Sequence, residues 1–306
     1  MQVVALQALS RSFGSTSSLP RCHYVVLGVP VEVVCDVESI ACRLDETYAA
    51  FRVDRTISGD PLVLWARDAG DGTVEVGDSD GYAAHRLSEQ DALVDLLAHI
   101  VQGLLRRLHA RGFHAIHAAS LAHSGGALIV AGETGRGKTT LALGLIRRGL
   151  GLLSDEIALV EPDEGRILPY RRSLHVRPGT PELIPELGFL LERPRNRLGG
   201  GIEWTLPPWE LECAFPGSLG EPTPLSHVLL LDGEPNPLRA PSISPLSAAR
   251  GAVELLAGAF GAAVDFRGSL ARLSDLLGGV ACGRLRAGDL DATADLVVGW
   301  LEGSHA

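Results

Sequence analysis

The stretch from Gly132 to Thr139, Gly-Glu-Thr-Gly-Arg-Gly-Lys-Thr, decides how the rest of this chain is interpreted. It fits the pattern G-x-x-x-x-G-K-[ST], in which glycines let several backbone N–H groups turn toward an anion at the start of a helix. In such a P-loop the lysine reaches the β- and γ-phosphates of a nucleoside triphosphate, and the hydroxyl of the last residue binds Mg²⁺. The candidate nucleotide-binding residues are Gly132, Glu133, Thr134, Gly135, Arg136, Gly137, Lys138, Thr139 and Thr140.

The residues on either side of this loop agree with it. Residues 127–131, Ala-Leu-Ile-Val-Ala, are a short apolar run typical of a buried strand, and residues 139–148 predict a helix that Gly149 ends. A second strand is expected over residues 152–160. Strand, loop, helix and strand in this order predict a mononucleotide-binding unit and an α/β fold.

Lys138 is the only lysine of the chain, because every other one of the 27 basic residues is an arginine. A genome rich in G and C accounts for arginine elsewhere, but not for the lysine that remains. Its retention indicates that a compact, flexible ammonium is needed at this place, where a planar guanidinium would not serve. Lys138 is therefore a candidate catalytic residue as well as a phosphate ligand.

Two adjacent acids, Asp155 and Glu156, follow the expected helix and the start of the second strand. Elsewhere such a pair is usually a solvated turn. Beside a P-loop, adjacent carboxylates can divide metal binding and proton acceptance between them. The sequence thus predicts a magnesium site formed with Thr139, next to a general base.

This region resembles the HPr kinase/phosphorylases and, more distantly, the ATP-dependent phosphoenolpyruvate carboxykinases. Their pattern is a His after an apolar turn, a strand, a P-loop, a helix closed by Leu-Ile-x-Arg-Gly, and a Leu-x-x-Asp-Asp strand. The matching residues here are His117, residues 128–149 and Leu152-Leu-Ser-Asp155-Glu156. The resemblance implies that Asp155 is the general base, that Glu156 and Thr139 hold the metal, and that His117 lies near the transferred phosphate. For His117 a purely structural role is the alternative, and His114 and His123 are expected to be structural.

The chain also departs from that family. Glu156 stands where the family has a second Asp, Thr139 where it usually has Ser, and no later Arg-Gly-Leu-Gly segment is found. The chain is more similar to shorter relatives that include the lasso-peptide precursor kinases, which phosphorylate a serine of a short peptide. That resemblance implies ATP and Mg²⁺ as cofactors and a peptide or small protein as acceptor. Family members assemble into oligomers, which makes a homo-oligomer an open expectation here.

Three arginines, Arg171, Arg172 and Arg177, follow a proline-containing turn after the second strand. Arginine suits both developing phosphoryl charge and a substrate carboxylate. Arg171 and Arg172 are the substrate or phosphate candidates. Ion pairs on the surface of an acidic protein are the alternative for all three, and Arg136 within the loop is expected to point to solvent.

The first third of the chain has a different pattern. Runs rich in β-branched and aromatic residues predict short strands near residues 23–28, 31–35, 48–53 and 62–65, and residues 88–112 predict an amphipathic helix capped by Ser88 and ended by Gly112. The expected organisation is a β-rich N-terminal module over residues 1–110, ending in this helix, and an HPr kinase-like P-loop domain over residues 111–306. Residues 193–208, rich in Arg, Gly and Pro, are expected to form an exposed loop.

Bulk composition limits the partners. The net charge of −10 and a pI near 5.5 argue against nucleic acid, because binding to phosphate backbones needs clustered Lys and Arg. Five scattered cysteines show no zinc spacing and indicate reduced thiols of a cytoplasmic protein. No secretion signal is evident in the first twenty residues, and no apolar stretch approaches the roughly 20 residues that span a bilayer, so no membrane association is expected.

Three functions are compatible with these observations. The first is an ATP-dependent kinase that transfers a phosphoryl group to a serine hydroxyl of a peptide or small protein. The second is a small-molecule hydroxyl kinase, and the third is a nucleotide-binding switch or scaffold without catalysis. In the third case Asp155 and Glu156 would only hold metal.

Overall fold

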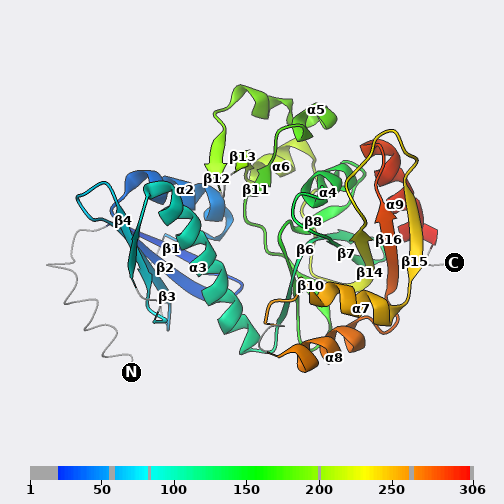
Figure 1. Cartoon of the computed structure of the whole chain (residues 1–306), viewed down its shortest axis with the longest axis horizontal. Helices are drawn as coiled ribbons and strands as arrows, with labels where there is room; N and C mark the ends of the chain where they lie inside the picture. The colour runs from blue at the N-terminus through cyan, green and yellow to red at the C-terminus, as the bar shows by residue number, and fades with distance from the viewer. Residues whose placement is uncertain (1–19, 55–58, 82–83, 199–200, 262–264, 304–306) are drawn as a thin grey trace. The chain divides into compact units, whose positions relative to one another are not determined.

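The computed structural model describes residues 20–54, 59–81, 84–198, 201–261 and 265–303 (Figure 1). The chain divides into two compact units, Met1–Arg107 with Arg197–Gly201, and Leu108–Asn196 with Ile202–Ala306. The expectation about a secretion signal concerns residues that lie almost wholly outside the described ranges. Within these ranges the structure is a mixed α/β protein, as predicted, and no helix is both long and apolar enough to cross a bilayer.

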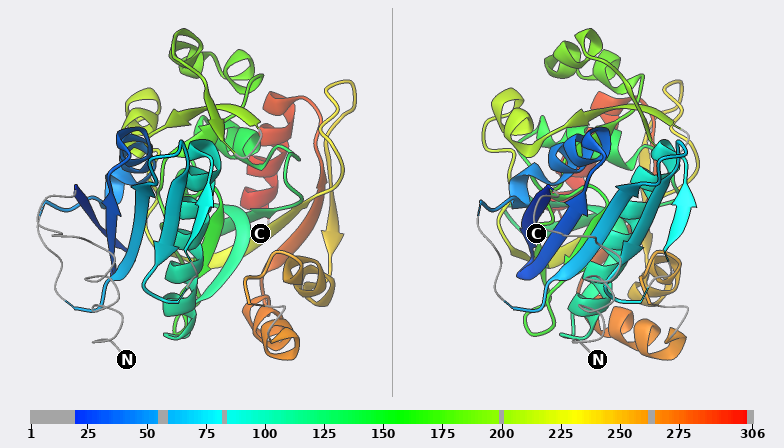
Figure 2. Two further views of the ribbon diagram at one scale, coloured as in Figure 1. Left: turned by 60° about the vertical axis from the view of Figure 1, so that its left-hand side comes forward. Right: turned by 90° about the vertical axis from the view of Figure 1, so that its left-hand side faces the viewer.

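The first unit is built on a sheet that is antiparallel except where β2 runs parallel to β3. Its strands lie in the order β1 (Arg21–Val26), β2 (Val29–Cys35), β3 (Leu62–Asp68), β4 (Val74–Asp78) and β5 (His85–Leu87). The helical elements are α2 (Glu38–Tyr48), the 3₁₀ turn η1 (Ala49–Phe51) and α3 (Glu89–His109). Figure 2 shows α3 lying along one face of this sheet, where a Cβ added to Gly103 would meet the Leu62 side chain.

The predicted helix over residues 88–112 is confirmed in α3, whose start Ser88 caps by accepting a hydrogen bond from the Asp91 N–H at 3.2 Å. The strand predicted over residues 48–53 is wrong. Those residues continue from α2 into η1. The reason lies just upstream, where Ile40, Leu44 and Tyr48 recur at the helical spacing of four and are all buried.

The second unit has a larger mixed sheet with β6 (His114–His123) near its middle. One edge of β6 pairs antiparallel with β7 (Gly126–Ala131), and β7 runs parallel to the next strand, β14 (Thr223–Leu231). The remaining strands of the sheet are β8 (Gly151–Ser154), β9 (Ile157–Val160), β10 (Arg166–Leu168), β15 (Ser242–Leu246) and β16 (Ala281–Arg286). The single strand predicted over residues 152–160 is two strands, β8 and β9, which pair with successive parts of β6, and the β8 pairing contains a register shift between Ser120 and Leu121.

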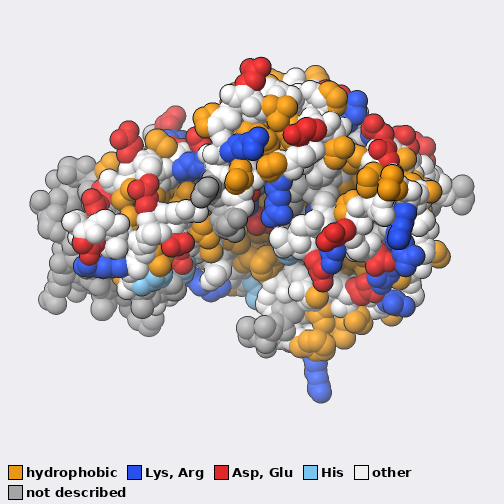
Figure 3. Space-filling model, turned by 45° about the horizontal axis from the view of Figure 1, so that its top comes forward, with side chains coloured by type: hydrophobic (Ala, Val, Ile, Leu, Met, Phe, Trp, Pro, Cys, Tyr) orange, Lys and Arg blue, Asp and Glu red, His pale blue; other side chains and the backbone are white. Residues whose placement is uncertain are grey.

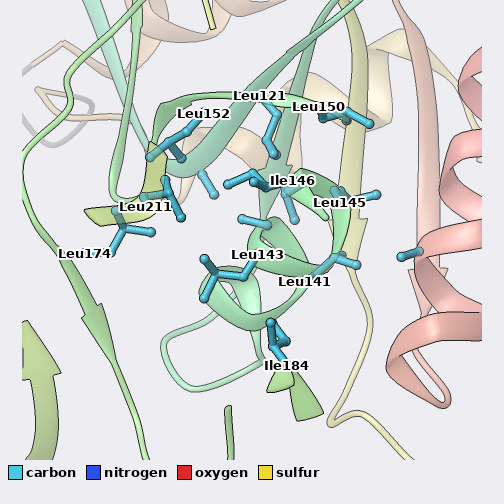
Figure 4. Packing of buried hydrophobic residues seen from close by; sticks show 14 of the residues in the cluster. Leu121, Leu141, Leu143, Leu145, Ile146, Leu150, Leu152, Leu174, Ile184 and Leu211 are labelled. Carbon is cyan, nitrogen blue, oxygen red and sulfur yellow. The ribbon is translucent and has the colours of Figure 1, made fainter. Parts of the chain in front are cut away.

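Helices cover both faces of this sheet (Figure 1). On one face lie α4 (Lys138–Ile146) and α9 (Leu290–Gly303), and on the other lie α7 (Ala248–Leu256) and α8 (Phe266–Leu276). β7 serves both layers, because Leu128 and Val130 pack under α4 while Ile129 packs toward α7 and α8. Figure 4 shows the leucines of α4 interlocked with those of β6 and β8. The loop before α4 is thus carried by a strand and a helix that are both deeply buried.

A smaller layer completes the second unit. Its elements are β11 (Leu174–Val176), α5 (Thr180–Leu183), η2 (Pro185–Glu192), β13 (Gly201–Leu206) and α6 (Pro208–Ala214). The short strand β12 (Asn196–Leu198) begins at the last residue before the segment Arg197–Gly201, which is assigned to the first unit. The exposed loop expected over residues 193–208 is therefore wrong in its second half, where β13 pairs antiparallel with β11. Trp204, 1% exposed, joins the core beneath α4, and its indole N–H donates to the Arg193 carbonyl at 3.2 Å.

We expect Gly151→Ala to destabilise the second unit. A Cβ at Gly151 would lie 2.6 Å from the backbone of Gly220, which is closer than real contacts allow. Backbone displacement from such overpacking costs about 1–3 kcal/mol. Urea unfolding measures the loss, and Gly188→Ala is the control because its Cβ would meet nothing within 4 Å. Equal stability of the two variants would contradict this close approach.

Candidate functional site

The glycine-rich loop, residues 132–137, joins the end of β7 to the start of α4. Gly135 and Gly137 both have φ of +86°, a left-handed conformation that residues with a Cβ rarely adopt. Gly137 is also the residue that caps α4, and its carbonyl accepts the Leu141 N–H at 2.8 Å. The backbone N–H groups of the first turn of α4 have no partner within the helix and lie beside the loop. Their partial positive charge favours the binding of an anion there.

Lys138 folds back over this loop. Its Nζ donates to the carbonyl of Gly132 at 2.8 Å and to that of Glu133 at 3.2 Å, and the residue is 8% exposed. Burial lowers the pKa of Lys138, whereas the nearby charges of Asp155 and Glu156 raise it. The ammonium is thus held at the loop by weak backbone acceptors, which a phosphate oxygen can replace.

The two acids follow β8 directly, as the sequence predicted. The Ser154 hydroxyl accepts the N–H groups of Glu156 at 3.3 Å and Ile157 at 3.0 Å, and this fixes the bend between β8 and β9. Asp155 accepts a hydrogen bond from the Thr139 side chain, while its Oδ1 is buried and has no hydrogen-bond partner among the described residues. Burial raises the pKa of Asp155, and the Thr139 hydrogen bond opposes that rise.

Glu156 forms an ion pair with Arg172. His117 lies beside them, with a hydrogen bond from its imidazole to the backbone of Glu156. Burial lowers the pKa of His117, and the Lys138 charge lowers it further. A neutral imidazole at neutral pH follows, with one N–H to donate.

These groups line one cavity of about 580 Å³, within the usual range of roughly 300–1,000 Å³ for small-molecule sites. Of the residues predicted from the sequence, the cavity is lined by His117, Thr134, Gly135, Arg136, Gly137, Lys138, Thr139, Thr140, Asp155, Glu156 and Arg172. Gly132 and Glu133 lie at the loop without lining it. Arg171 is separated from the others, because its guanidinium donates to the Gly220 carbonyl and lies 3.5 Å from Glu221.

Arg136 lies at the exposed edge of the cavity. Its guanidinium pairs with the exposed carboxylates of Glu133 at 2.7 Å and Glu234 at 3.5 Å. On the face shown in Figure 3, the described basic side chains are likewise interspersed with acidic ones.

The structure adds residues that sequence reasoning missed. His175 lines the cavity, and its Nδ1 lies 2.8 Å from Oε1 of Glu203, which is 7% exposed. Pairing of β11 with β13 brings the two side chains together, since His175 lies opposite Thr205, two residues along from Glu203. No sequence pattern links them across this separation. Apolar residues also line the cavity and are called its apolar wall here, namely Leu231, Pro235, Pro237, Ala287 and Leu290.

The donors suit Mg²⁺ better than a metal held entirely by protein. No group of three or more His, Cys, Asp or Glu side chains in the described ranges is arranged to hold a metal. Mg²⁺ commonly binds one or two protein oxygens and takes its other ligands from water and phosphate. The hydroxyl of Thr139 beside the carboxylate of Asp155, with its unpartnered Oδ1, provides such a minimal set.

Comparisons with known proteins find distant similarity among solved structures. No protein-family model matches the chain, and no curated protein matches it. Among solved structures, the HPr(Ser) kinase/phosphatase from Coxiella burnetii is similar with 15% sequence identity and a TM-score of 0.31, over 63% of this chain and 99% of that one. The site is therefore interpreted from its own geometry.

An acyl-phosphate derivative of ATP should acylate Lys138, because this ammonium lies at the glycine-rich loop and its pKa is lowered. No second lysine competes, so peptide mass spectrometry reads a single site against the N-terminal amine as internal control. Excess ATP should suppress labelling of Lys138 and leave the N-terminal amine unchanged. Labelling of Lys138 that ATP does not suppress would contradict a nucleotide site here.

Asp155→Asn should raise the melting temperature of the protein at neutral pH without nucleotide or metal. A raised folded-state pKa contributes stability that is present below the ordinary value of 3.8 and is lost as the pH rises through the raised pKa. Each tenfold preference for the neutral acid is worth about 1.4 kcal/mol, and 1 kcal/mol moves Tm by about 2–4 °C in larger domains.

The difference between Asp155→Asn and the natural protein should therefore shrink as the pH is lowered toward about 4. Differential scanning fluorimetry over this range checks it, with the exposed Asp163→Asn as the matched control. A difference that grows on acidification would show that burial does not disfavour the Asp155 carboxylate.

Proposed function

We propose that this chain is an ATP-dependent kinase that transfers the γ-phosphoryl group to a serine hydroxyl of a peptide or small protein. The observation that carries the proposal is the convergence of Lys138, Thr139 and Asp155 on one cavity, with Thr139 hydrogen-bonded to Asp155. A glycine-rich anion site, an ammonium and a buried carboxylate are the parts that phosphoryl transfer needs.

Each residue has a separate task in binding. The N–H groups at the start of α4 and the Lys138 ammonium hold the β- and γ-phosphates, and the apolar wall with Pro235 and Pro237 receives the nucleoside. Thr139 and Glu156 would hold Mg²⁺, which neutralises phosphate charge when bound, and Asp155 is left to accept a proton. The ion pair of Glu156 with Arg172 keeps both side chains ordered before the metal enters.

In the transfer step, the acceptor oxygen forms a bond to the γ-phosphorus while the bond to the β,γ-bridging oxygen breaks. The electron pair of the broken bond remains on that oxygen, which leaves as part of ADP. The proton of the acceptor hydroxyl passes to the Asp155 carboxylate. Burial favours this direction, because it raises the pKa of Asp155 and so improves the carboxylate as a base.

In this scheme His117 gives up its hydrogen bond to the Glu156 backbone and donates its one N–H to a phosphate oxygen. Its pKa is lowered by burial and by Lys138, so the imidazole stays neutral and donates one hydrogen bond without adding positive charge. This role suits orientation of the γ-phosphoryl group, with charge neutralisation left to Lys138.

The test is incubation with γ-labelled ATP, Mg²⁺ and the peptide encoded beside the gene. We expect label on a serine of that peptide, and Asp155→Asn should reduce transfer by about 10² or more while nucleotide binding changes little. Asp163→Asn is the control, since Asp163 is exposed in the turn after β9.

The other outcomes distinguish the alternatives. Label on small hydroxyl compounds but on no peptide would indicate a small-molecule kinase. Tight nucleotide binding with no transfer to any acceptor would overturn the kinase proposal in favour of a nucleotide-binding switch.

A further inference from the structure

The charges around the cavity are mostly partnered within the chain. Arg136 pairs with Glu133 and Glu234, Arg172 pairs with Glu156, and Lys138 is bound by two carbonyls. Arg177 differs. It lines the same cavity, its side chain is exposed, and no carboxylate of the described residues lies within 4 Å of its guanidinium.

Arg177 is nevertheless close to the glycine-rich loop. Its Nη1 lies 3.7 Å from the position that a Cβ would occupy on Gly135, which is an ordinary van der Waals distance. The positive charge of Arg177 also lowers the pKa of the Lys138 ammonium. Two cations thus line the same cavity, and they repel each other unless an anion lies between them.

The backbone of Arg177 is fixed relative to α4. Its carbonyl accepts the Thr180 N–H at 3.2 Å, which closes a turn that contains Gly179 at φ of +94°. The Thr180 hydroxyl lies 2.9 Å from the hydroxyl of Thr140, two residues after Lys138 on α4, and Thr180 is 5% exposed. This hydroxyl pair anchors the turn to the phosphate-binding helix, while the Arg177 side chain stays free to reach a ligand.

We propose that Arg177 is a catalytic residue that contacts the transferred phosphoryl group, and that Thr180 is the positioning residue that holds it there. The inference rests on the proposed kinase function. Arg177 donates hydrogen bonds to non-bridging γ-oxygens as the bond to the ADP oxygen breaks and the bond to the acceptor oxygen forms. It gains and loses no proton, because guanidinium stays charged throughout. Arginines supplied in this manner raise phosphoryl-transfer rates by about 10³–10⁵ in other nucleotide hydrolases.

The test compares two nucleotide complexes by calorimetry, MgADP and MgADP with aluminium fluoride, which mimics the phosphoryl group in flight. Arg177→Gln should weaken binding of MgADP by less than about threefold and that of the fluoride complex by about thirtyfold or more, since the contact belongs to the transition state. Arg177→Lys should restore only part of the loss, because an ammonium lacks the planar fork. Arg267→Gln, at an exposed position on α8, is the matched control.

Equal weakening of both complexes, or of neither, would overturn the assignment. No acceptor is needed, so the result is independent of the peptide assay. If no phosphoryl transfer is detected but the affinity for the fluoride complex still depends on Arg177, the proposed function is wrong and the contact between Arg177 and the phosphoryl group is supported. Conversely, active transfer with an unaltered fluoride complex in Arg177→Gln would sink this inference alone.

Thr180 is tested separately. Thr180→Val should lower kcat or affinity for the fluoride complex about tenfold with an unchanged KM for ATP, because the loss of a positioning contact acts on the transition state. Thr180→Ser retains the hydroxyl and should restore the natural behaviour. A Thr180→Ser variant as impaired as Thr180→Val, at equal melting temperature, would refute the role of the hydroxyl pair.

Discussion

The pairing of β6 with a neighbour on each edge is the constraint on which the candidate site depends. On one edge Ala118 lies opposite Ala131, the last residue before the glycine-rich loop, and on the other Ser120 lies opposite Ser154, the last residue before the two acids. The glycine-rich loop and the bend that carries the two acids therefore both lie beside the same part of β6, next to His117. Ladder hydrogen bonds thus fix the separation between the phosphate site and the carboxylates.

Two opposing effects act on the charged groups of this site, namely the loss of hydration on burial and the attraction between opposite charges. Burial disfavours the charged forms of Lys138 and Asp155; the Asp155 charge reduces this cost for Lys138, and the Arg172 charge reduces it for Asp155. Such an arrangement adds little to folding, because desolvation offsets much of the Coulomb attraction. It does leave two groups ready for a ligand of high charge density. Such a ligand can replace the backbone carbonyls that bind Lys138, and it can contact the unpartnered oxygen of the Asp155 carboxylate. The buried charges lower the local stability of the fold. Ionisable groups with shifted pKa values are common in clefts that bind ligands.

The sequence predicted the parts of the fold that rest on local patterns. The strand, loop and helix around Lys138 were predictable because apolar periodicity and glycine placement act over a few residues. The acids were predictable from their position after a strand. Among the three arginines, sequence alone could not separate Arg171 from the others. Which of them lines the cavity depends on where Gly220 passes and on how the turn at Thr180 is anchored, and both are long-range contacts.

The errors have the same physical origin. Residues 48–53 have strand-like composition, yet the buried face of α2 extends the helical path through them. The segment 193–208 is rich in Gly, Pro and Arg, yet Trp204 finds a place in the core under α4, and that burial outweighs the weak local preference. The pair of His175 and Glu203 joins residues that only the β11–β13 ladder brings together.

The apolar wall of the cavity has a consequence for ligand exchange. Pro235 and Pro237 have backbones restricted by their rings, and Asn236 between them is tied down, since its N–H donates to the Ala287 carbonyl at 3.1 Å and its Oδ1 accepts the Leu238 N–H at 3.0 Å. This rim is rigid before any ligand arrives, so it contributes little to the entropic cost of association. In the kinase proposed above, product would therefore leave past the exposed Arg177 side chain and not past this rim, and the lifetime of the bound product would depend on how readily that side chain moves.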